Sequence, residues 1–261
     1  MNGAVKSADR TLVILELLTQ HSEGLTLYEV QTMLELPKSS TYGLLMTMVN
    51  RGFLEQDPDT RRFRVGIRLW QAGQSYVAVT DLERVALPYM EALRDELNET
   101  VQLATLDGTD NVYIAKVDPD QQLRLASRVG ARLPAHATGI GKALLSQLDH
   151  EELERRFADF EFVQYTQHTI SSLPQLVAAV RKVRAVGYAT DNSEYTPGVC
   201  CVAAPVLRPR GLAGAAISVS IPEVRRTNAL IKKAVAGVLS TARDISQRFG
   251  GQESRLALTV D

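Results

Sequence analysis

The amino-terminal fold follows from residues 26–65, which read TLYEVQTMLELPKSSTYGLLMTMVNRGFLEQDPDTRRFRV. Thr26 is a good N-cap for a helix over residues 27–34, and Glu29 stands three positions later, as in a capping box. Pro37 begins a further helix, because the first turn of a helix tolerates a residue without an N–H. A short strand at 53–55, a turn at 57–60 and a returning strand at 61–65 follow. These signals predict two helices and a hairpin.

An amphipathic helix precedes this stretch. Ala8, Leu12, Leu15 and Leu18 recur at helical spacing, and Gly24 is a plausible stop for that helix. Three helices followed by a hairpin predict a winged helix-turn-helix domain over residues 1–66.

The second helix of a helix-turn-helix enters the major groove, where its first residues meet phosphates and base edges. Here that helix begins with a lysine, three hydroxyls and a phenol, which suit such contacts. On the returning strand Arg62 and Arg64 share the face opposite Phe63 and Val65. The alternative is a solvated helix start and an ordinary charged hairpin. The candidate DNA contacts are Thr26, Lys38, Ser39, Ser40, Thr41, Tyr42, Arg61, Arg62 and Arg64.

The charge balance excludes a generally basic protein that coats nucleic acid. The chain has 29 Lys and Arg against 30 Asp and Glu, a formal net charge of -1. Residues 1–80 hold eight residues of each sign. DNA binding therefore depends on where the cations lie and on presenting two copies, and it is expected to be strongly salt-dependent.

The remaining sequence predicts a linker helix at 67–81, a second domain at 82–250 and a tail at 251–261. Within the second domain the residue patterns predict helices at 83–98, 139–148, 151–157, 173–186 and 227–249. They predict strands at 101–106, 112–117, 123–129, 188–191, 201–207 and 212–220. Because hairpins combine with helices, the fold class is α/β (α+β) with a mostly antiparallel sheet.

Composition narrows the function classes further. Hydrophobic residues make up 45% and charged residues 23%, which is typical of a globular protein and not of a disordered or membrane chain. The two cysteines, Cys200 and Cys201, are adjacent, so they build neither a disulfide framework nor a CxxC metal pair. We expect a cytoplasmic protein without a secretory signal, a metal or a cofactor.

Six segments follow one another in an order and spacing typical of a known family. They are residues 12–18, 36–42, 51–54, 134–145, 198–206 and 217–220. Together they resemble the IclR-type bacterial transcriptional regulators over nearly the whole chain. The resemblance implies a winged helix-turn-helix, a helical linker and a GAF-like C-terminal domain that binds a small metabolite. It also implies homodimers that commonly pair into homotetramers, and we predict a palindromic double-stranded DNA operator.

The recognition helix departs from the family pattern at two positions. Relatives often have an arginine after the Thr-Tyr pair and a second basic residue near the middle of this helix. This chain has Gly43 and Met46 there. The expected arginine contact with DNA is therefore missing, and the operator of a relative does not transfer.

The same resemblance implies the residues of the metabolite pocket, which are Gly139, Ile140, Asp191, Cys201, Ser218 and Ser220. Glycines 139 and 141 precede a helix, where backbone N–H groups bind anions and glycine allows close approach. Packing glycines at a helix start are the alternative. Ser218 and Ser220 lie two apart on a strand, so both hydroxyls face one side. We expect apolar side chains from 101–106 and 123–129 on the other walls, and a small organic acid as the effector.

Two alternative functions would depend on reactive cysteine or serine side chains. A redox sensor would use Cys200 and Cys201, but adjacent strand residues point to opposite faces. An enzyme would use Cys201 or Ser220 as a nucleophile, which needs an adjacent base and an orienting group. The sequence has neither a GxSxG elbow nor a Walker GxxxxGK[ST] pattern, so we expect no enzyme.

Overall fold

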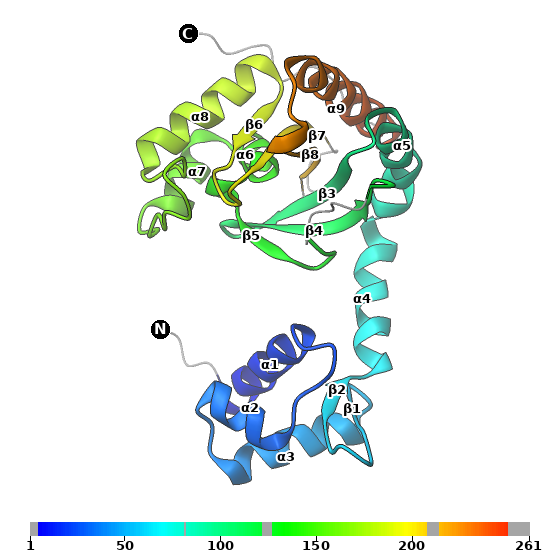
Figure 1. Ribbon diagram of the computed structural model, residues 1–261. Helices are drawn as coiled ribbons and strands as arrows, with labels where there is room; N and C mark the ends of the chain where they lie inside the picture. Colours follow the sequence, from blue (N-terminus) through cyan, green and yellow to red (C-terminus); the bar gives the residue numbers. More distant parts are fainter. Residues whose placement is uncertain (1–4, 81, 122–126, 208–213, 250–261) are drawn as a thin grey trace. The chain divides into compact units, whose positions relative to one another are not determined.

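Figure 1 shows the computed structural model of the chain, which describes residues 5–80, 82–121, 127–207 and 214–249. The chain divides into two compact units, residues 1–81 and 82–261. Each unit has a hydrophobic core of its own. The predicted tail at 251–261 lies outside the described residues.

The amino-terminal unit has the predicted three helices, hairpin and linker helix. Its elements are α1 (Lys6–Thr19), α2 (Leu27–Leu34), α3 (Lys38–Asn50), β1 (Leu54–Gln56), β2 (Phe63–Val65) and α4 (Ile67–Thr80). The core gathers the apolar stripe of each helix and the inward side of the hairpin, with Ile14, Leu18, Val30, Leu45, Leu54 and Phe63 fully or almost fully buried. The winged helix-turn-helix is therefore confirmed.

The hairpin is attached to the helices through the turn before α2. Leu25 and Phe63 exchange two backbone hydrogen bonds, of 3.0 and 2.7 Å. Gly24 adopts a φ of +74°, and a Cβ there would lie 2.6 Å from the Phe63 carbonyl oxygen. Glycine is therefore required at this turn, both for its conformation and for the close approach of β2.

The second unit is built on a six-stranded antiparallel sheet with the strand order β5-β4-β3-β8-β7-β6. The strands are β3 (Thr100–Asp107), β4 (Asp110–Val117), β5 (Arg132–Pro134), β6 (Ala189–Asn192), β7 (Val199–Val206) and β8 (Ala215–Pro222). The helices are α5 (Leu82–Leu97), α6 (Gly139–Leu145), α7 (His150–Phe157), α8 (Leu173–Val186) and α9 (Asn228–Arg248), with short 3-10 turns at Ala135–Ala137 and Glu223–Arg225. The predicted mixed class with an antiparallel sheet is confirmed.

The two faces of this sheet are covered differently. On β8, Ile217, Val219 and Ile221 pack in the cluster that contains α5 and α9. Ala216 packs in the cluster that contains α6, so the period of two also turns Ser218 and Ser220 to the α6 side. In Figure 1 the pair α5 and α9 lies on one side of the sheet and α6 and α8 lie on the other.

Two predicted elements in this unit extend too far toward their carboxyl ends. The predicted strand at 123–129 lies partly outside the described residues, and residues 127–129 form no strand. Among the described strands, the edge next to β4 is formed by β5, which pairs with Asp110–Val112 over three residues. The helix predicted to reach residue 148 ends at Leu145, after which Ser146 bonds back to the last turn.

Candidate functional site

The recognition helix α3 presents one face to the outside and buries the other. Leu45 and Met48 are buried, whereas Lys38, Ser39, Tyr42, Gly43, Thr47 and Asn50 are exposed. Ser40 is half-buried, and its Oγ donates to the Pro37 carbonyl oxygen at 3.0 Å. Four of the candidate DNA contacts at the start of this helix, namely Lys38, Ser39, Ser40 and Tyr42, thus remain accessible to a partner.

Thr41 is an exception, and its prediction as a DNA contact is wrong. Its side chain is fully buried, and Oγ1 donates to the Pro37 carbonyl oxygen at 2.9 Å. Residues 41, 45 and 48 fall on one side of a helix, and that side faces the core. A prediction that takes the run 38–42 as one set ignores this helical phase.

Thr26 forms the predicted capping box with Glu29. Its backbone N–H donates to Glu29 Oε2 at 2.7 Å, and Glu29 N–H donates back to Thr26 Oγ1. The Thr26 N–H and the Thr26 hydroxyl, which donates to Glu29 Oε2 at 2.9 Å, hold the pKa of Glu29 below its usual range. The carboxylate therefore stays charged at the start of α2, and both the backbone N–H and the hydroxyl of Thr26 are occupied within the chain.

The three wing arginines have different surroundings. Arg62 donates to the Gly24 carbonyl oxygen at 2.7 Å and forms two hydrogen bonds to the Glu29 carboxylate, at 3.1 and 3.2 Å. Arg61 is exposed, with a φ of +57°. Arg64 is exposed and donates to the Glu23 carbonyl oxygen, at 3.3 Å. Arg62 thus links the wing to α2, whereas the guanidinium groups of Arg61 and Arg64 are exposed and can contact DNA phosphates.

Replacement of Arg62 by alanine is expected to loosen the wing, because it removes the link between β2 and the capping box. Amide hydrogen exchange at Leu25 and Phe63 should accelerate, while the salt dependence of DNA binding should change little. Arg64→Ala is the matched variant. It should leave both amides protected and lower the slope of log K against log salt by about 0.9 for each phosphate that Arg64 neutralises. The reverse pattern would contradict this division of roles.

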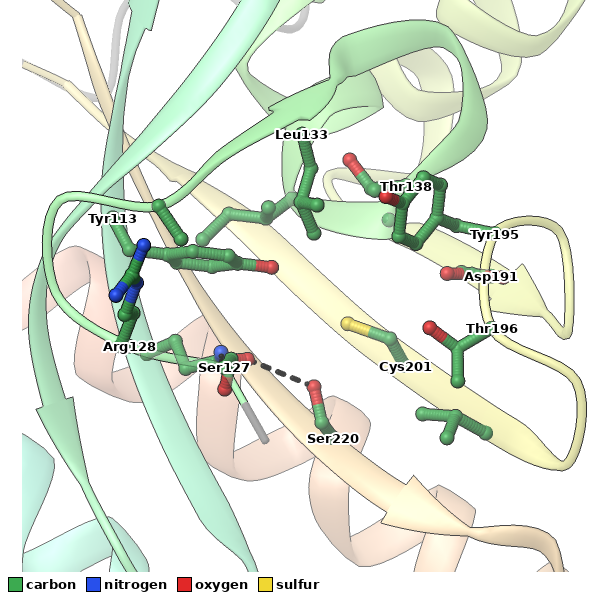
Figure 2. A pocket seen from close by; sticks show the side chains of 15 residues that line it. Tyr113, Ser127, Arg128, Leu133, Thr138, Asp191, Tyr195, Thr196, Cys201 and Ser220 are labelled. Atoms are coloured by element: carbon green, nitrogen blue, oxygen red, sulfur yellow. Dashed lines mark hydrogen bonds between the residues drawn. The ribbon is translucent and has the colours of Figure 1, made fainter. Parts of the chain in front are cut away.

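The second unit contains a cavity of about 330 Å³ between the sheet and the start of α6 (Figure 2). Its size lies at the lower end of the range for small-molecule sites. The lining residues come from the sheet, the start of α6, the loop between β6 and β7, and the segment before β5. They are Gln102, Tyr113, Ser127, Arg128, Ala131, Leu133, Thr138, Gly139, Ile140, Asp191, Tyr195, Thr196, Val199, Cys201 and Ser220.

Five of the six residues implied for the metabolite pocket line this cavity. Only Ser218 does not; it is fully buried, two residues before Ser220 on β8, and its Oγ has no hydrogen-bond partner among the described residues. The expected apolar walls are not seen among the described residues, because 101–106 contributes Gln102 and 127–129 contributes Ser127 and Arg128, whereas 123–126 lie outside the described residues. Period-two alternation along β3, combined with the sheet order, would have placed Gln102 opposite Ser218 and on the same face of the sheet as Ser220.

A hydrogen-bonded chain forms the polar wall of the cavity. Ser220 Oγ donates to Gln102 Oε1 at 3.0 Å, and Gln102 Nε2 donates to Ser127 Oγ at 2.7 Å. Ser220 points across the cavity from Tyr113 and Asp191 in Figure 2. The bonds orient the Gln102 amide and leave serine oxygens to accept from, or donate to, a bound molecule.

Asp191 is a carboxyl of the cavity whose pKa lies near neutral pH. Burial raises the pKa of its carboxyl to about 7, against the opposing effect of the Glu194 and Gly139 N–H groups. Glu194 N–H donates to Asp191 Oδ1 at 2.8 Å. Glu194 itself pairs with the buried Lys142, whose Nζ lies 2.6 Å from Oε1. Asp191 can therefore act as a hydrogen-bond donor when protonated and as an acceptor when ionised.

The glycines at the start of α6 are used for packing. A Cβ on Gly141 would lie 2.3 Å from the Cα and the carbonyl oxygen of Ala135. A Cβ on Gly139 would lie 3.2 Å from the Cys201 sulfur and 3.3 Å from Cβ of Asp191. Protein atoms therefore occupy the space beside both glycines, in agreement with the packing alternative, although Gly139 also lines the cavity.

The cysteines have the properties of structural thiols. Burial raises the pKa of both Cys200 and Cys201 to about 12. Cys201 lines the cavity, whereas Cys200 donates from Sγ to Glu223 Oε2 at 2.7 Å. Thiols held in the protonated form are poor nucleophiles and are slow to oxidise.

Across the described residues no group of His, Cys, Asp and Glu is placed to hold a metal, and none of the described helices is long and apolar enough to cross a membrane.

Comparisons with known proteins agree with both parts of the chain. The model of the IclR helix-turn-helix domain matches residues 7–58, and the model of the bacterial transcriptional regulator IclR C-terminal domain matches residues 74–247. The HTH-type transcriptional regulator BhcR of Paracoccus denitrificans is 33% identical over 94% of this chain and 88% of its own. KdgR of Dickeya chrysanthemi is 34% identical over 95% of this chain and 81% of its own.

A solved structure agrees as well. The crystal structure of a transcriptional regulator from Rhodococcus sp. RHA1 superimposes with a TM-score of 0.80 at 29% identity, covering 95% of this chain and 99% of that chain. The matches include the exposed recognition helix and the domain that contains the cavity. The chain therefore belongs to the IclR family of bacterial transcriptional regulators, and it is a DNA-binding regulator and not an enzyme.

Proposed function

We propose that this regulator reads a palindromic operator as a homodimer, and that a small organic acid in the cavity changes its affinity for DNA. The observation that carries the proposal is the described lining of the cavity, which combines one cation with several hydroxyls and a carboxyl whose pKa is about 7. A ligand with a carboxylate and a second oxygen function fits this set.

Arg128 supports the acidic character of the ligand. Among the described residues that line the cavity it is the only Lys or Arg, and no ion pair joins it to another described residue. Figure 2 places its side chain beside the ring of Tyr113. A guanidinium without a carboxylate partner is well suited to bind a ligand carboxylate in a bidentate manner.

Asp191 and the polar wall support a second oxygen function on the ligand. Protonated Asp191 donates a hydrogen bond to a carbonyl or carboxylate oxygen, and ionised Asp191 accepts one from a hydroxyl. Ser220 and Tyr113 add hydroxyls on other sides. We therefore infer a hydroxy acid, a keto acid or a dicarboxylic acid as the effector.

The amino-terminal unit supports the two-copy arrangement. Leu12 on α1 and Ile67 and Trp70 on α4 are large apolar side chains that are each about 60% exposed. Burial of such side chains against a second copy is favourable. Two copies of a recognition helix related by two-fold symmetry read a palindrome with half-sites about one helical turn apart.

Selection from a randomised duplex library tests the operator. The full-length protein at moderate salt is expected to enrich a palindromic site. Enrichment of a sequence without two-fold symmetry would contradict the proposed homodimeric reading.

Ser220→Leu is expected to abolish ligand binding, because the larger side chain fills the cavity and breaks the bond to Gln102. The ligand is first identified by measuring the thermal shift of the wild-type protein with a panel of hydroxy, keto and dicarboxylic acids. Ser220→Ala should weaken that ligand about two- to tenfold, because it removes one hydrogen bond. Ser240→Leu, at an exposed position of α9, is the matched control and should bind normally. Unchanged binding by Ser220→Leu would place the site elsewhere.

A further inference from the structure

The exposed face of the recognition helix carries little charge. Between Lys38 and Asn50 the only charged side chain is that of Lys38 itself. The outward positions after it include Ser39, Gly43 and Asn50. Because DNA-binding proteins obtain much of their affinity by neutralising phosphates with Lys and Arg, α3 alone supplies an unusually weak electrostatic contact.

Two cations lie beside this face on another helix. Lys6 and Arg10 stand four residues apart on α1, so they share one side of it. Together with Ser40, Gly43 and Thr47 of α3 they line an open groove of about 670 Å³. Neither cation has an ion-pair partner among the described residues. The groove therefore places two available positive charges next to the surface that enters the major groove of DNA.

Gly43 keeps this groove open. A Cβ built at this position meets nothing within 4 Å, although glycine in a helix interior costs about 1 kcal/mol relative to alanine. The fold has no steric need for glycine here. The absence of a side chain does, however, allow another chain to approach the backbone of α3 closely from the side of Lys6 and Arg10.

We propose that the groove between α1 and α3 receives the sugar-phosphate backbone of one DNA strand, with Lys6 and Arg10 neutralising phosphates. The inference rests on the DNA-binding function and adds a contact surface to it. Three observations favour duplex DNA as the occupant: the groove continues the exposed face of α3, its charge is opposite to that of DNA, and Gly43 leaves room for a bulky backbone. The cations of α1 thus replace those missing from the middle of α3.

The experiment measures the affinity of full-length variants for the selected operator and for a duplex of unrelated sequence, over a series of salt concentrations. Lys6→Gln with Arg10→Gln should weaken binding to both duplexes by at least about tenfold at about 0.1 M salt. The slope of log K against log salt should fall by about 1.8 for every recognition domain bound. Lys6→Arg with Arg10→Lys preserves the charges and should stay close to the wild type.

Two further variants separate this effect from a general change of charge or fold. Arg181→Gln with Lys182→Gln removes two exposed cations of α8 and should leave DNA binding unchanged. Gly43→Leu fills the groove without meeting protein atoms at its Cβ, so it should keep the thermal stability but weaken DNA binding at least about tenfold.

The outcomes separate this inference from the DNA-binding function itself. Wild-type affinity and slope in Lys6→Gln with Arg10→Gln would overturn the inference while leaving the proposed function intact. Loss of operator binding alone, with normal binding to the unrelated duplex, would assign these cations to base reading and overturn the phosphate contact. If the wild type bound neither duplex, the operator proposal itself would fail.

Discussion

Gly141→Ala is expected to destabilise the second unit by about 3 kcal/mol, at the upper end of the cost of overpacking a tight site. The added methyl group would stand 2.3 Å from two backbone atoms of Ala135 and 2.6 Å from Thr138 Oγ1. Backbone atoms do not move aside as a flexible side chain does. Thr138 is also the N-cap of α6 and accepts the Gly141 N–H at 3.0 Å, so the start of the helix shifts with it.

Gly43→Ala is the matched control for this substitution. It also places alanine in a helix, but nothing lies within 4 Å of the new Cβ, so it should stabilise the amino-terminal unit by up to about 1 kcal/mol. Urea unfolding, followed by hydrogen exchange in each unit, measures both effects. Similar small effects at the two positions would contradict the packing role of Gly141.

The stability of the second unit is expected to fall as the pH rises from about 4 to 7, because of Asp191. Its pKa is about 7 in the fold and has an ordinary value of 3.8 in an exposed carboxyl. Between these values the folded protein retains a proton that the unfolded chain has released. The stabilisation is therefore complete below about pH 4 and disappears as the pH passes about 7, by about 4 kcal/mol at most.

Asp191→Asn isolates this contribution. Asparagine does not ionise and keeps one oxygen to accept the Glu194 N–H, so the fall in stability between about pH 4 and 7 should be smaller in this variant. Asp159→Asn replaces an exposed carboxylate and should retain the pH profile of the wild type. The profile is measured by denaturant unfolding at a series of pH values. A parallel profile in wild type and Asp191→Asn would show that Asp191 is ionised throughout.

The protonation state of Asp191 should also affect the affinity for the ligand. An organic acid that receives a hydrogen bond from protonated Asp191 should bind more weakly above about pH 7, where the two carboxylates repel each other. A ligand that donates a hydroxyl to ionised Asp191 should bind more tightly there. The pH dependence of ligand affinity thus distinguishes the two classes of effector.

The helices of this fold can be predicted from the sequence because their signals are local. The capping box of Thr26 and Glu29 spans four residues, and the structure reproduces both its bonds and the helix bounds. The helix at 173–186 likewise has its predicted bounds. Such features need only the neighbouring residues, which the sequence displays directly.

The features that local patterns do not predict depend on residues far apart in the chain. The sequence predicts Arg62 as a DNA contact, but its Glu29 partner lies 33 positions away. The strand β5 has three residues, and its existence depends on pairing with β4. Gln102 enters the cavity because β3 lies next to β8, and strand order does not follow from local periodicity.

The coupling between ligand and operator tests the central claim most directly. The dissociation constant for the selected operator is measured with and without saturating ligand, and that for the ligand with and without operator. The account predicts that the two constants change by the same factor in the wild type, as linkage requires, and that added ligand has no effect on Ser220→Leu. Saturable binding of the ligand in the cavity with no change in operator affinity would contradict the account.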